Sequence, residues 1–206
     1  MEEKLLKRIR YDFLIDSIDI IKPKKIIEIG LAQGLRSFQM IKQAFIFNKE
    51  IDFCGYDVFD TKDENWHKIV GNGKKVFSQS YIQKLLMPLN ANIKFYPGMT
   101  CDTLWKNHNK ADLVFLDGDH RIEAIKNDFN AVKNSKVIVF DDYYITGEHN
   151  NFTIDKYGCN ELIQSFPENQ VFISPPTLKF PDVRVAFWSM ELKIIEDLKK
   201  VFISTF

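Results

Sequence analysis

The sequence predicts an α/β protein with a seven-stranded, mostly parallel sheet and helices on both of its faces. Apolar runs of strand length alternate with segments of helical periodicity along most of the chain, a pattern typical of βαβ units. The 206 residues are 45% hydrophobic and 27% charged, which suits one domain with a sizeable core. No shift in composition marks an internal boundary, so we expect a single domain spanning residues 1–206.

Each expected element rests on hydrophobic spacing. Apolar runs predict the seven strands, at 24–30, 51–57, 91–97, 111–117, 136–142, 170–175 and 183–190. Apolar residues three to four positions apart predict helices at 5–21, 35–47, 79–87, 122–132 and 158–166, and a short one about Leu104. The domain therefore divides into an N-terminal helix at 1–22, a core at 24–190 and a closing helix at 191–206.

The charge balance and the cysteines exclude several classes of function. Lysine and arginine together number 28, as do aspartate and glutamate, so no general field favours nucleic acid or an anionic membrane surface. We expect a cytoplasmic protein, because no segment has about eighteen uninterrupted apolar residues and the N-terminus lacks a secretory apolar core. Cys54, Cys101 and Cys159 are odd in number and lack C-x-x-C spacing, so we expect small apolar side chains rather than disulfides or a zinc site.

A glycine turn follows the first expected strand. In IIEIGLAQGLRS, Glu28 precedes Gly30, and Gly34 opens the next helix. Glycine lets the chain turn sharply and lets a ligand approach the main chain, although two glycines after a strand can also be a purely structural turn. The G-x-G-x-x-G fingerprint is absent because Ala32 occupies its second glycine position, which disfavours an NAD(P)-dependent oxidoreductase.

A crowd of acidic residues follows two later strands. Asp117 ends one apolar run, and Asp141 with Asp142 ends the next. If the two strands are neighbours, these carboxylates converge at one edge of the sheet, and their repulsion needs a cation or shared protons. A hard divalent cation suits such oxygen ligands, and zinc is disfavoured because no cysteine or second histidine accompanies them. We expect Asp119 to cap the following helix and His120 to be a general base or acid, with capping or a surface position as its alternative.

Several of these motifs resemble one family. The E-x-G-x-x-x-G turn resembles motif I of class I S-adenosylmethionine-dependent methyltransferases. The phrases LDGDHRIEAIKNDF, VIVFDDY and KYGCNELIQSF resemble the group that includes the macrocin and mycinamicin sugar O-methyltransferases and the cephalosporin hydroxylase-like proteins. The likeness runs from about Lys24 to Phe166. Two departures are Arg121-Ile122 after the histidine and Asn134-Ser135-Lys136 before the fifth strand, and the first could alter the choice of substrate.

The resemblance implies a Rossmann-like sheet whose last strand is antiparallel, and a cofactor, S-adenosylmethionine. It implies cofactor contacts from the glycine turn, from an acid after the second strand that accepts the ribose hydroxyls, from YPGMTCDTL near the adenine and from the fourth strand end. The implied cofactor-binding residues are Glu28, Gly30, Gly34, Asp57, Met99, Thr100 and Asp117. From the residues alone, Asp57 could also be a solvated acid or helix cap, and Thr100 could merely cap a short helix.

The resemblance also implies a mechanism. Asp117, Asp141 and Asp142 would bind Mg²⁺ or another hard divalent cation, which would lower the pKa of an acceptor hydroxyl while His120 takes its proton. We therefore expect an O-methyltransferase (EC 2.1.1.-) whose partner is a small acceptor, a sugar or other polyhydroxylated compound, with catalytic residues His120 and Asp117. The alternatives are a methyltransferase that works without metal and a non-catalytic S-adenosylmethionine-binding domain.

The loops at 61–75 and 143–157 are the expected acceptor loops. They carry aromatic or imidazole side chains that suit stacking on a ring, although each alone is an ordinary packing residue: Trp66, His67, Tyr143, Tyr144, His149 and Phe152. The sequence leaves the oligomeric state open, with a homodimer among the options.

Overall fold

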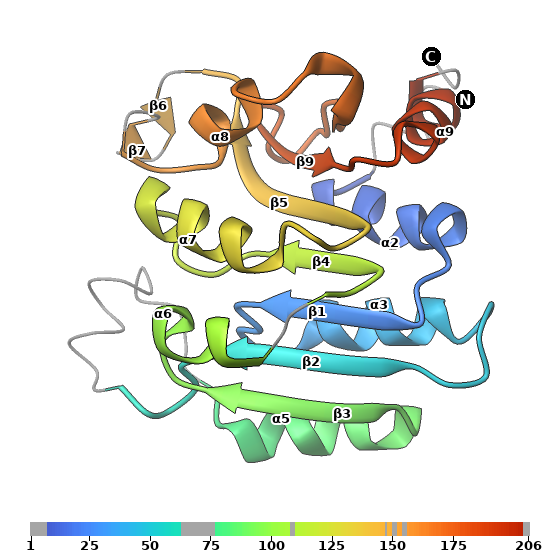
Figure 1. Cartoon of the computed structure of the whole chain (residues 1–206), viewed down its shortest axis with the longest axis vertical. Coiled ribbons are helices and arrows are strands. Elements are labelled where there is room, and N and C mark those ends of the chain that lie inside the picture. Colours follow the sequence, from blue (N-terminus) through green and yellow to red (C-terminus); the bar gives the residue numbers. More distant parts are fainter. Residues whose placement is uncertain are drawn as a thin grey trace.

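The computed structural model describes residues 8–62, 77–107, 110–146, 148–149, 152–153 and 156–203. Seven strands form one sheet in the order β3-β2-β1-β4-β5-β9-β8 (Figure 1). The strands are β1 Lys25–Ile29, β2 Asp52–Asp57, β3 Asn92–Pro97, β4 Leu113–Leu116, β5 Val137–Tyr144, β8 Val171–Ile173 and β9 Val183–Trp188. The first five pair in parallel, and β9 pairs antiparallel with β5 and β8. The predicted seven-stranded, mostly parallel sheet with an antiparallel last strand is confirmed.

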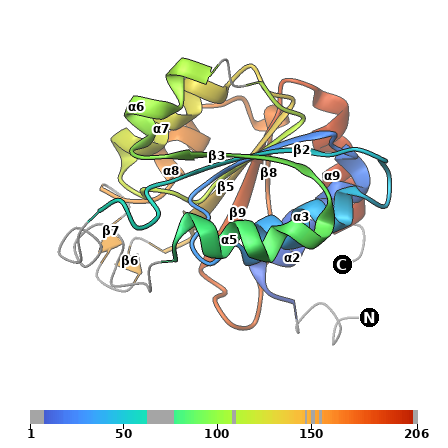
Figure 2. The ribbon, with the colours of Figure 1, turned by 90° about the horizontal axis from the view of Figure 1, so that it is seen from below.

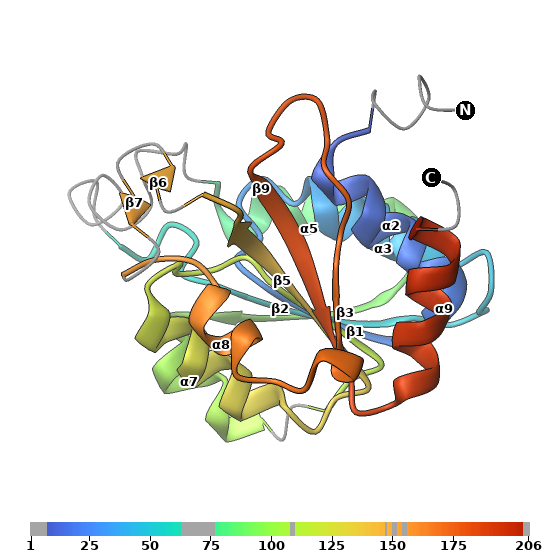
Figure 3. The same ribbon diagram turned by 90° about the horizontal axis from the view of Figure 1, so that it is seen from above.

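Helices cover both faces of the sheet (Figures 2 and 3). One face carries α2 Arg10–Ile21, α3 Leu35–Ala44, α5 Gln79–Leu86 and α9 Leu192–Ile203. The other carries α6 Thr100–Thr103, α7 Ile122–Val132 and α8 Asn160–Gln164. Short 3-10 turns occur at η1 Met87–Leu89, η2 Trp105–Asn107 and η3 Glu168–Gln170. Because both faces are covered, all four residues of β4 are buried, which explains its unbroken apolar sequence.

The expected elements are present, but several begin or end at other residues than predicted, and the helix expected at 5–21 begins at Arg10. The expected helix at 35–47 ends at Ala44, and the one at 158–166 spans only Asn160–Gln164. β5 continues two residues past Asp142 to Tyr144. Two very short strands, β6 Glu148–His149 and β7 Phe152–Thr153, pair within a segment that the sequence predicted as loop. Cys159 is buried as expected, but Cys101 is exposed on α6, so that cysteine does not fill an apolar site.

The helix α2 begins at the carboxyl edge of the sheet and ends at the opposite edge. At its end, Lys22 has a left-handed backbone (φ 50°) and Pro23 leads directly toward β1. At its start, the Asp12 carboxylate accepts the N–H of Ile9 over 2.9 Å. The chain therefore places Arg10 at the edge where parallel strands of an α/β sheet present their ligand sites.

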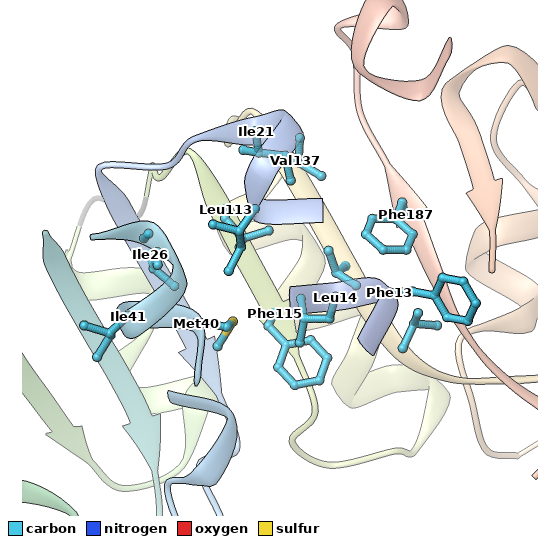
Figure 4. Packing of buried hydrophobic residues seen from close by; sticks show 14 of the residues in the cluster. Phe13, Leu14, Ile21, Ile26, Met40, Ile41, Leu113, Phe115, Val137 and Phe187 are labelled. Atoms are coloured by element: carbon cyan, nitrogen blue, oxygen red, sulfur yellow. The ribbon is translucent and has the colours of Figure 1, made fainter. Parts of the chain in front are cut away.

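The larger part of the core anchors this helix. Phe13 and Leu14 of α2 pack in one cluster with Phe115 of β4 and Phe187 of β9, beside Met40 of α3 (Figure 4). Phe13 and Leu14 are 1% and 0% exposed, and full burial of such side chains stabilises the fold by about 1.5 to 3 kcal/mol each. The N-terminal part of α2 is therefore packed against β4 and β9.

Candidate functional site

The turn after β1 is held by close backbone packing. Gly30 has φ +83°, and a Cβ atom there would lie 2.1 Å from the backbone oxygen of Asp117. Only glycine can occupy this position, because the β1 and β4 ends approach each other there without room for a side chain. Gly34 has φ +75° and lies against the Ile82 and Leu85 side chains of α5. The two glycines that the sequence singled out therefore fix the shape of the turn.

Asp57 at the end of β2 organises the same turn. Its Oδ2 accepts the backbone N–H of Leu31 over 2.6 Å and that of Ala32 over 3.2 Å, and its Oδ1 accepts the N–H of Phe59 over 2.8 Å. These bonds help to hold Ala32 at φ 48°, a conformation that costs energy for a residue with a Cβ atom. Asp57 lies beside the glycine turn as predicted, and its Oδ1, which accepts one hydrogen bond, keeps a further acceptor site.

Glu28 lies beneath the turn and not on its surface. Its side chain is 1% exposed and accepts the hydroxyl of Ser37 on α3. The pKa of Glu28 is raised to about 8, chiefly by burial and to a smaller extent by the charge of Asp57, while Ser37 and Arg36 oppose the shift. In this arrangement Glu28 connects β1 to the helix that follows the turn, and its buried position differs from that of a side chain open to a cofactor.

Met99 and Thr100 form the turn between β3 and α6. Met99 is the residue that precedes α6, and Thr100 is its first residue. Thr100 is hydrogen-bonded to the carboxylate of Asp128 on α7, a buried group whose pKa burial raises to about 6. Asp128 was not predicted from the sequence. It lies between the apolar Ile125 and Phe129, and a charged residue on the apolar side of a helical pattern indicates a buried polar contact. Asp128 therefore connects α7 to the turn expected near the adenine.

The structure brings the three acidic residues of the predicted metal site into one cluster with His120, and we name this cluster of side chains the acidic pocket. The Nδ1 atom of His120 lies 3.2 Å from Oδ2 of Asp142, and its Nε2 atom lies 3.6 Å from Oδ1 of Asp117. Only 17% of the His120 side chain is exposed. Asp141 belongs to the same pocket, because its carboxylate shares a guanidinium partner with Asp142. The predicted convergence at the ends of β4 and β5 is correct.

A bulge in β5 turns both members of the acidic pair into the pocket. The register with β9 shifts between Phe140 and Tyr143, and Asp142 has φ 55°. In a regular strand, neighbouring side chains point to opposite faces, but an extra residue breaks that alternation. Tyr144 supports the strained residue, because its hydroxyl donates to Oδ2 of Asp142 over 2.9 Å. The sequence predicted the outcome from a strand ending at Asp142, whereas the structure achieves it within a longer strand.

Two residues of α2 that the sequence reasoning did not select complete the pocket. The Nε and Nη2 atoms of Arg10 donate to Oδ1 and Oδ2 of Asp141 over 2.7 and 2.8 Å, and Nη2 also donates to Oδ1 of Asp142 over 3.2 Å. The hydroxyl of Tyr11 donates to Oδ2 of Asp141 over 2.7 Å. The Asp141 side chain is 1% exposed. The buried carboxylate is therefore paired in the bidentate geometry that suits a guanidinium.

The charges of this pair stabilise each other. Burial opposes ionisation of Asp141, but the adjacent Arg10 guanidinium holds the pKa of Asp141 below its ordinary value. Burial likewise opposes the charge on Arg10, and Asp141 holds the pKa of Arg10 above its ordinary value. The pKa of Tyr11 is raised by burial and then by Asp141, so its hydroxyl remains a donor. The repulsion among the carboxylates is thus offset, at least in part, by a side chain of the protein.

The expected three-carboxylate magnesium site does not fit this arrangement. Among the residues that the structure describes, no group of three or more histidine, cysteine, aspartate or glutamate side chains is placed to hold a metal ion. Both oxygens of Asp141 already accept hydrogen bonds from Arg10 and Tyr11. A metal ligated by Asp117, Asp141 and Asp142 would have to displace that guanidinium.

The structure describes the segment around His120 fully but the expected acceptor loops only in part. Asp119 accepts the N–H of Arg121 over 3.0 Å and pairs with its guanidinium, so it holds the segment before α7. Trp66 and His67 lie outside the described residues, and only the backbone of His149 and Phe152 is described. Among the described helices, none is long and apolar enough to cross a membrane.

Comparisons with known proteins bear on the fold. No protein-family model matches the chain, and no curated protein sequence matches it. An O-methyltransferase from Bacillus cereus solved in complex with SAH matches with a TM-score of 0.57 and 15% identity, over 86% of this chain and 79% of that one. The O-methyltransferase TomG from Streptomyces achromogenes, involved in tomaymycin synthesis and solved with SAM, matches with a TM-score of 0.54 and 12% identity, over 89% and 82%.

A third match is the N-terminal domain of EvdMO1, solved in the presence of SAH and D-fucose. Its TM-score is 0.54 and its identity 10%, over 88% of this chain and 83% of that one. At these identities the likeness concerns the fold alone. The chain has the α/β, Rossmann-like fold of these methyltransferases.

Proposed function

We propose that the protein is an S-adenosylmethionine-dependent O-methyltransferase that acts on a hydroxyl group of a small acceptor. The observation that carries this proposal is the position of His120. It is held between Asp142 and Asp117, and the backbone of Asp117 lies against Gly30 in the turn where the cofactor is expected. A base with restricted orientation next to a nucleoside-binding turn is what methyl transfer to a neutral hydroxyl needs.

The cofactor fits the turn after β1. Gly30, Ala32 and Gly34 have positive φ, and Ala32 is exposed, so the main chain of the turn is open to a ligand. Asp57 is partly exposed beside it, and its Oδ1 would accept a ribose hydroxyl at its remaining acceptor site. Met99 and Thr100 would contact the adenine, with Asp128 holding Thr100 in place. When bound, S-adenosylmethionine would supply an electrophilic methyl group on a sulfonium.

His120 would act as the general base. Its Nδ1–H would donate to Asp142, which leaves Nε2 to accept the proton of the acceptor hydroxyl. Nε2 of His120 would take the hydroxyl proton while the acceptor oxygen receives the methyl group that S-adenosylmethionine supplies, and S-adenosylhomocysteine would leave as the second product. Asp142 and Asp117 would then stabilise the imidazolium. A positioned base of this kind contributes about 100-fold to 10,000-fold to a rate.

The mechanism of methyl transfer could use a metal ion or work without one, and the geometry favours the mechanism without metal. Arg10 occupies both oxygens of Asp141. The steps above therefore use only side chains of the chain and its two substrates. EDTA should leave turnover unchanged, whereas a loss that magnesium restores would return the metal to the mechanism.

The acceptor is best described as a small polyhydroxylated compound. Asp117 and Asp142 beside His120 offer hydrogen-bond acceptors to the hydroxyl groups of such a molecule. D-fucose, present in the EvdMO1 structure, is a natural first member of a test panel of free sugars and glycosides.

Two measurements test the proposal. Calorimetric titration should detect S-adenosylmethionine binding but no comparable NADH binding, and a panel of hydroxylated acceptors should give S-adenosylhomocysteine release that depends on His120. Cofactor binding without turnover against any acceptor would indicate a non-catalytic binding domain. Absence of cofactor binding would refute the proposal.

A further inference from the structure

We infer that Arg10 is a built-in cation that takes the place of a divalent metal ion in the acidic pocket, so that the pocket excludes metals until Arg10 is removed. The inference concerns cation binding by the folded chain. It requires neither the cofactor nor methyl transfer, and its test is independent of both.

The contacts of Arg10 are those of a bridging cation. Its guanidinium spans Asp141 and Asp142, with three donor-to-oxygen distances of 2.7, 2.8 and 3.2 Å. A hard divalent ion bridging the same pair would bind those carboxylate oxygens directly. The two cations would compete for the same carboxylate oxygens and would repel each other there, so a bound guanidinium opposes binding of the metal ion.

Burial favours Arg10 over a metal ion in this competition. Both sides of the main pair are largely removed from solvent, since the Arg10 side chain is 17% exposed and that of Asp141 is 1% exposed. A buried carboxylate requires a counter-charge. The guanidinium is covalently part of the chain and is present whenever the domain is folded, whereas a metal must lose hydration water and displace it.

The surroundings of Arg10 hold it in position. Its Nη2 atom also donates to the Tyr11 hydroxyl over 2.9 Å, and that hydroxyl donates to Asp141. Arg36 belongs to the neighbouring helix α3, and its guanidinium lies 4.1 Å from the Tyr11 ring centroid. Tyr11 is therefore fixed between the pocket and α3, and together with the buried residues of α2 it restricts movement of Arg10.

The test compares manganese binding by wild type, Arg10→Met and Arg8→Met, all without cofactor. Manganese is a hard, paramagnetic divalent ion whose free form can be counted by electron paramagnetic resonance. Arg8 is a matched control because it lies just before the same helix but pairs with Asp16 and stacks over Phe13. Wild type and Arg8→Met should bind no stoichiometric Mn²⁺ up to about 1 mM, whereas Arg10→Met should bind one ion at least about tenfold more tightly.

Each outcome decides the inference. One Mn²⁺ bound by wild type at micromolar concentration would overturn it, and so would a folded Arg10→Met protein that binds no better than wild type. The gain should disappear when Asp141→Asn is added to Arg10→Met, since the ion needs that carboxylate. If Arg10→Met does not fold, Arg10→Lys provides the second test: it keeps the positive charge but loses the bidentate geometry, and it should still exclude Mn²⁺.

Discussion

The turn after β1 is built by residues close in the chain or at the ends of adjacent strands, whereas the charged pocket after β5 depends on partners far apart. Leu31 and its partner Asp57 are 26 positions apart, but Arg10 and Asp141 are 131 apart. The turn needs particular backbone angles, which glycine reveals in the sequence. The pocket needs a counter-charge, and any of the chain's 28 basic residues could supply one. Motifs therefore located the pocket but did not identify the cation in it.

The largest expected effect is a loss of folding stability when the turn after β1 is disrupted. Gly30→Ala should destabilise the fold by about 3 kcal/mol or more, because a Cβ atom would meet the Asp117 backbone at 2.1 Å in a left-handed conformation. Urea unfolding measures the change. Gly98→Ala is the matched control: its φ is also positive at +124°, but the nearest atom to the added Cβ lies 3.4 Å away. Equal destabilisation of both variants would show that the close packing of Gly30 is unimportant.

The next largest effect should be a loss of turnover when His120 in the acidic pocket is replaced. His120→Asn should reduce turnover by about 100-fold or more while S-adenosylmethionine affinity stays unchanged, because the base acts in the chemical step. Steady-state kinetics and calorimetric titration on the same preparation measure the two quantities. A loss of affinity with normal turnover at saturation would mean that His120 belongs to the cofactor site.

A smaller effect should be weaker cofactor binding when Asp57, beside the turn after β1, is replaced. Asp57→Ala should weaken S-adenosylmethionine binding by about 1 to 3 kcal/mol through lost charge-assisted hydrogen bonds. Asp52→Ala is the control, since Asp52 begins the same strand and its described side-chain partner is the exposed Asn92. Unchanged affinity in Asp57→Ala would remove the ribose contact from the account.

The smallest effect is a pH dependence of stability that belongs to Glu28. Its folded pKa of about 8 exceeds the ordinary 4.5, so between these values the folded state binds more protons and stability falls as pH rises, by at most about 1.4 kcal/mol per pH unit. Glu28→Gln should flatten the urea-unfolding free energy between about pH 6.5 and 8. Asp128, with a pKa near 6, contributes mainly below that window. Identical slopes in variant and wild type would contradict the buried, protonated state of Glu28.

The sequence predicted the sheet well because burial on both faces leaves a plain signal. The unbroken apolar run of β4 and the helical spacing of α7 were both located from residue types, and α7 has the predicted ends. The bulge at Asp142 had no such signal, because it depends on pairing between β5 and the much later β9. Local patterns therefore gave the elements, and long-range pairing set the details of the pocket.

The counter-charge was missed for the same reason. Arg10 and Tyr11 precede Phe13 in an amphipathic helix, where polar residues ordinarily face solvent. Only the packing of α2 against β4 and β9 brings them to the acidic pair. Asp128 was overlooked similarly. It is a charged residue of α7, and it is buried where its carboxylate bonds to Thr100 of α6. A basic residue near the start of a helix that precedes such a sheet is worth testing as a partner for acidic strand ends.

The structure of a crystal grown with S-adenosylmethionine and magnesium would test the proposed function and the role of Arg10 most directly. The nucleoside should lie on the Gly30 turn with its ribose at Asp57 and its methyl group facing His120, and the Arg10 guanidinium should remain between Asp141 and Asp142. A metal ion between those carboxylates with Arg10 displaced would contradict the role of Arg10, and a cofactor bound away from His120 would contradict the proposed function.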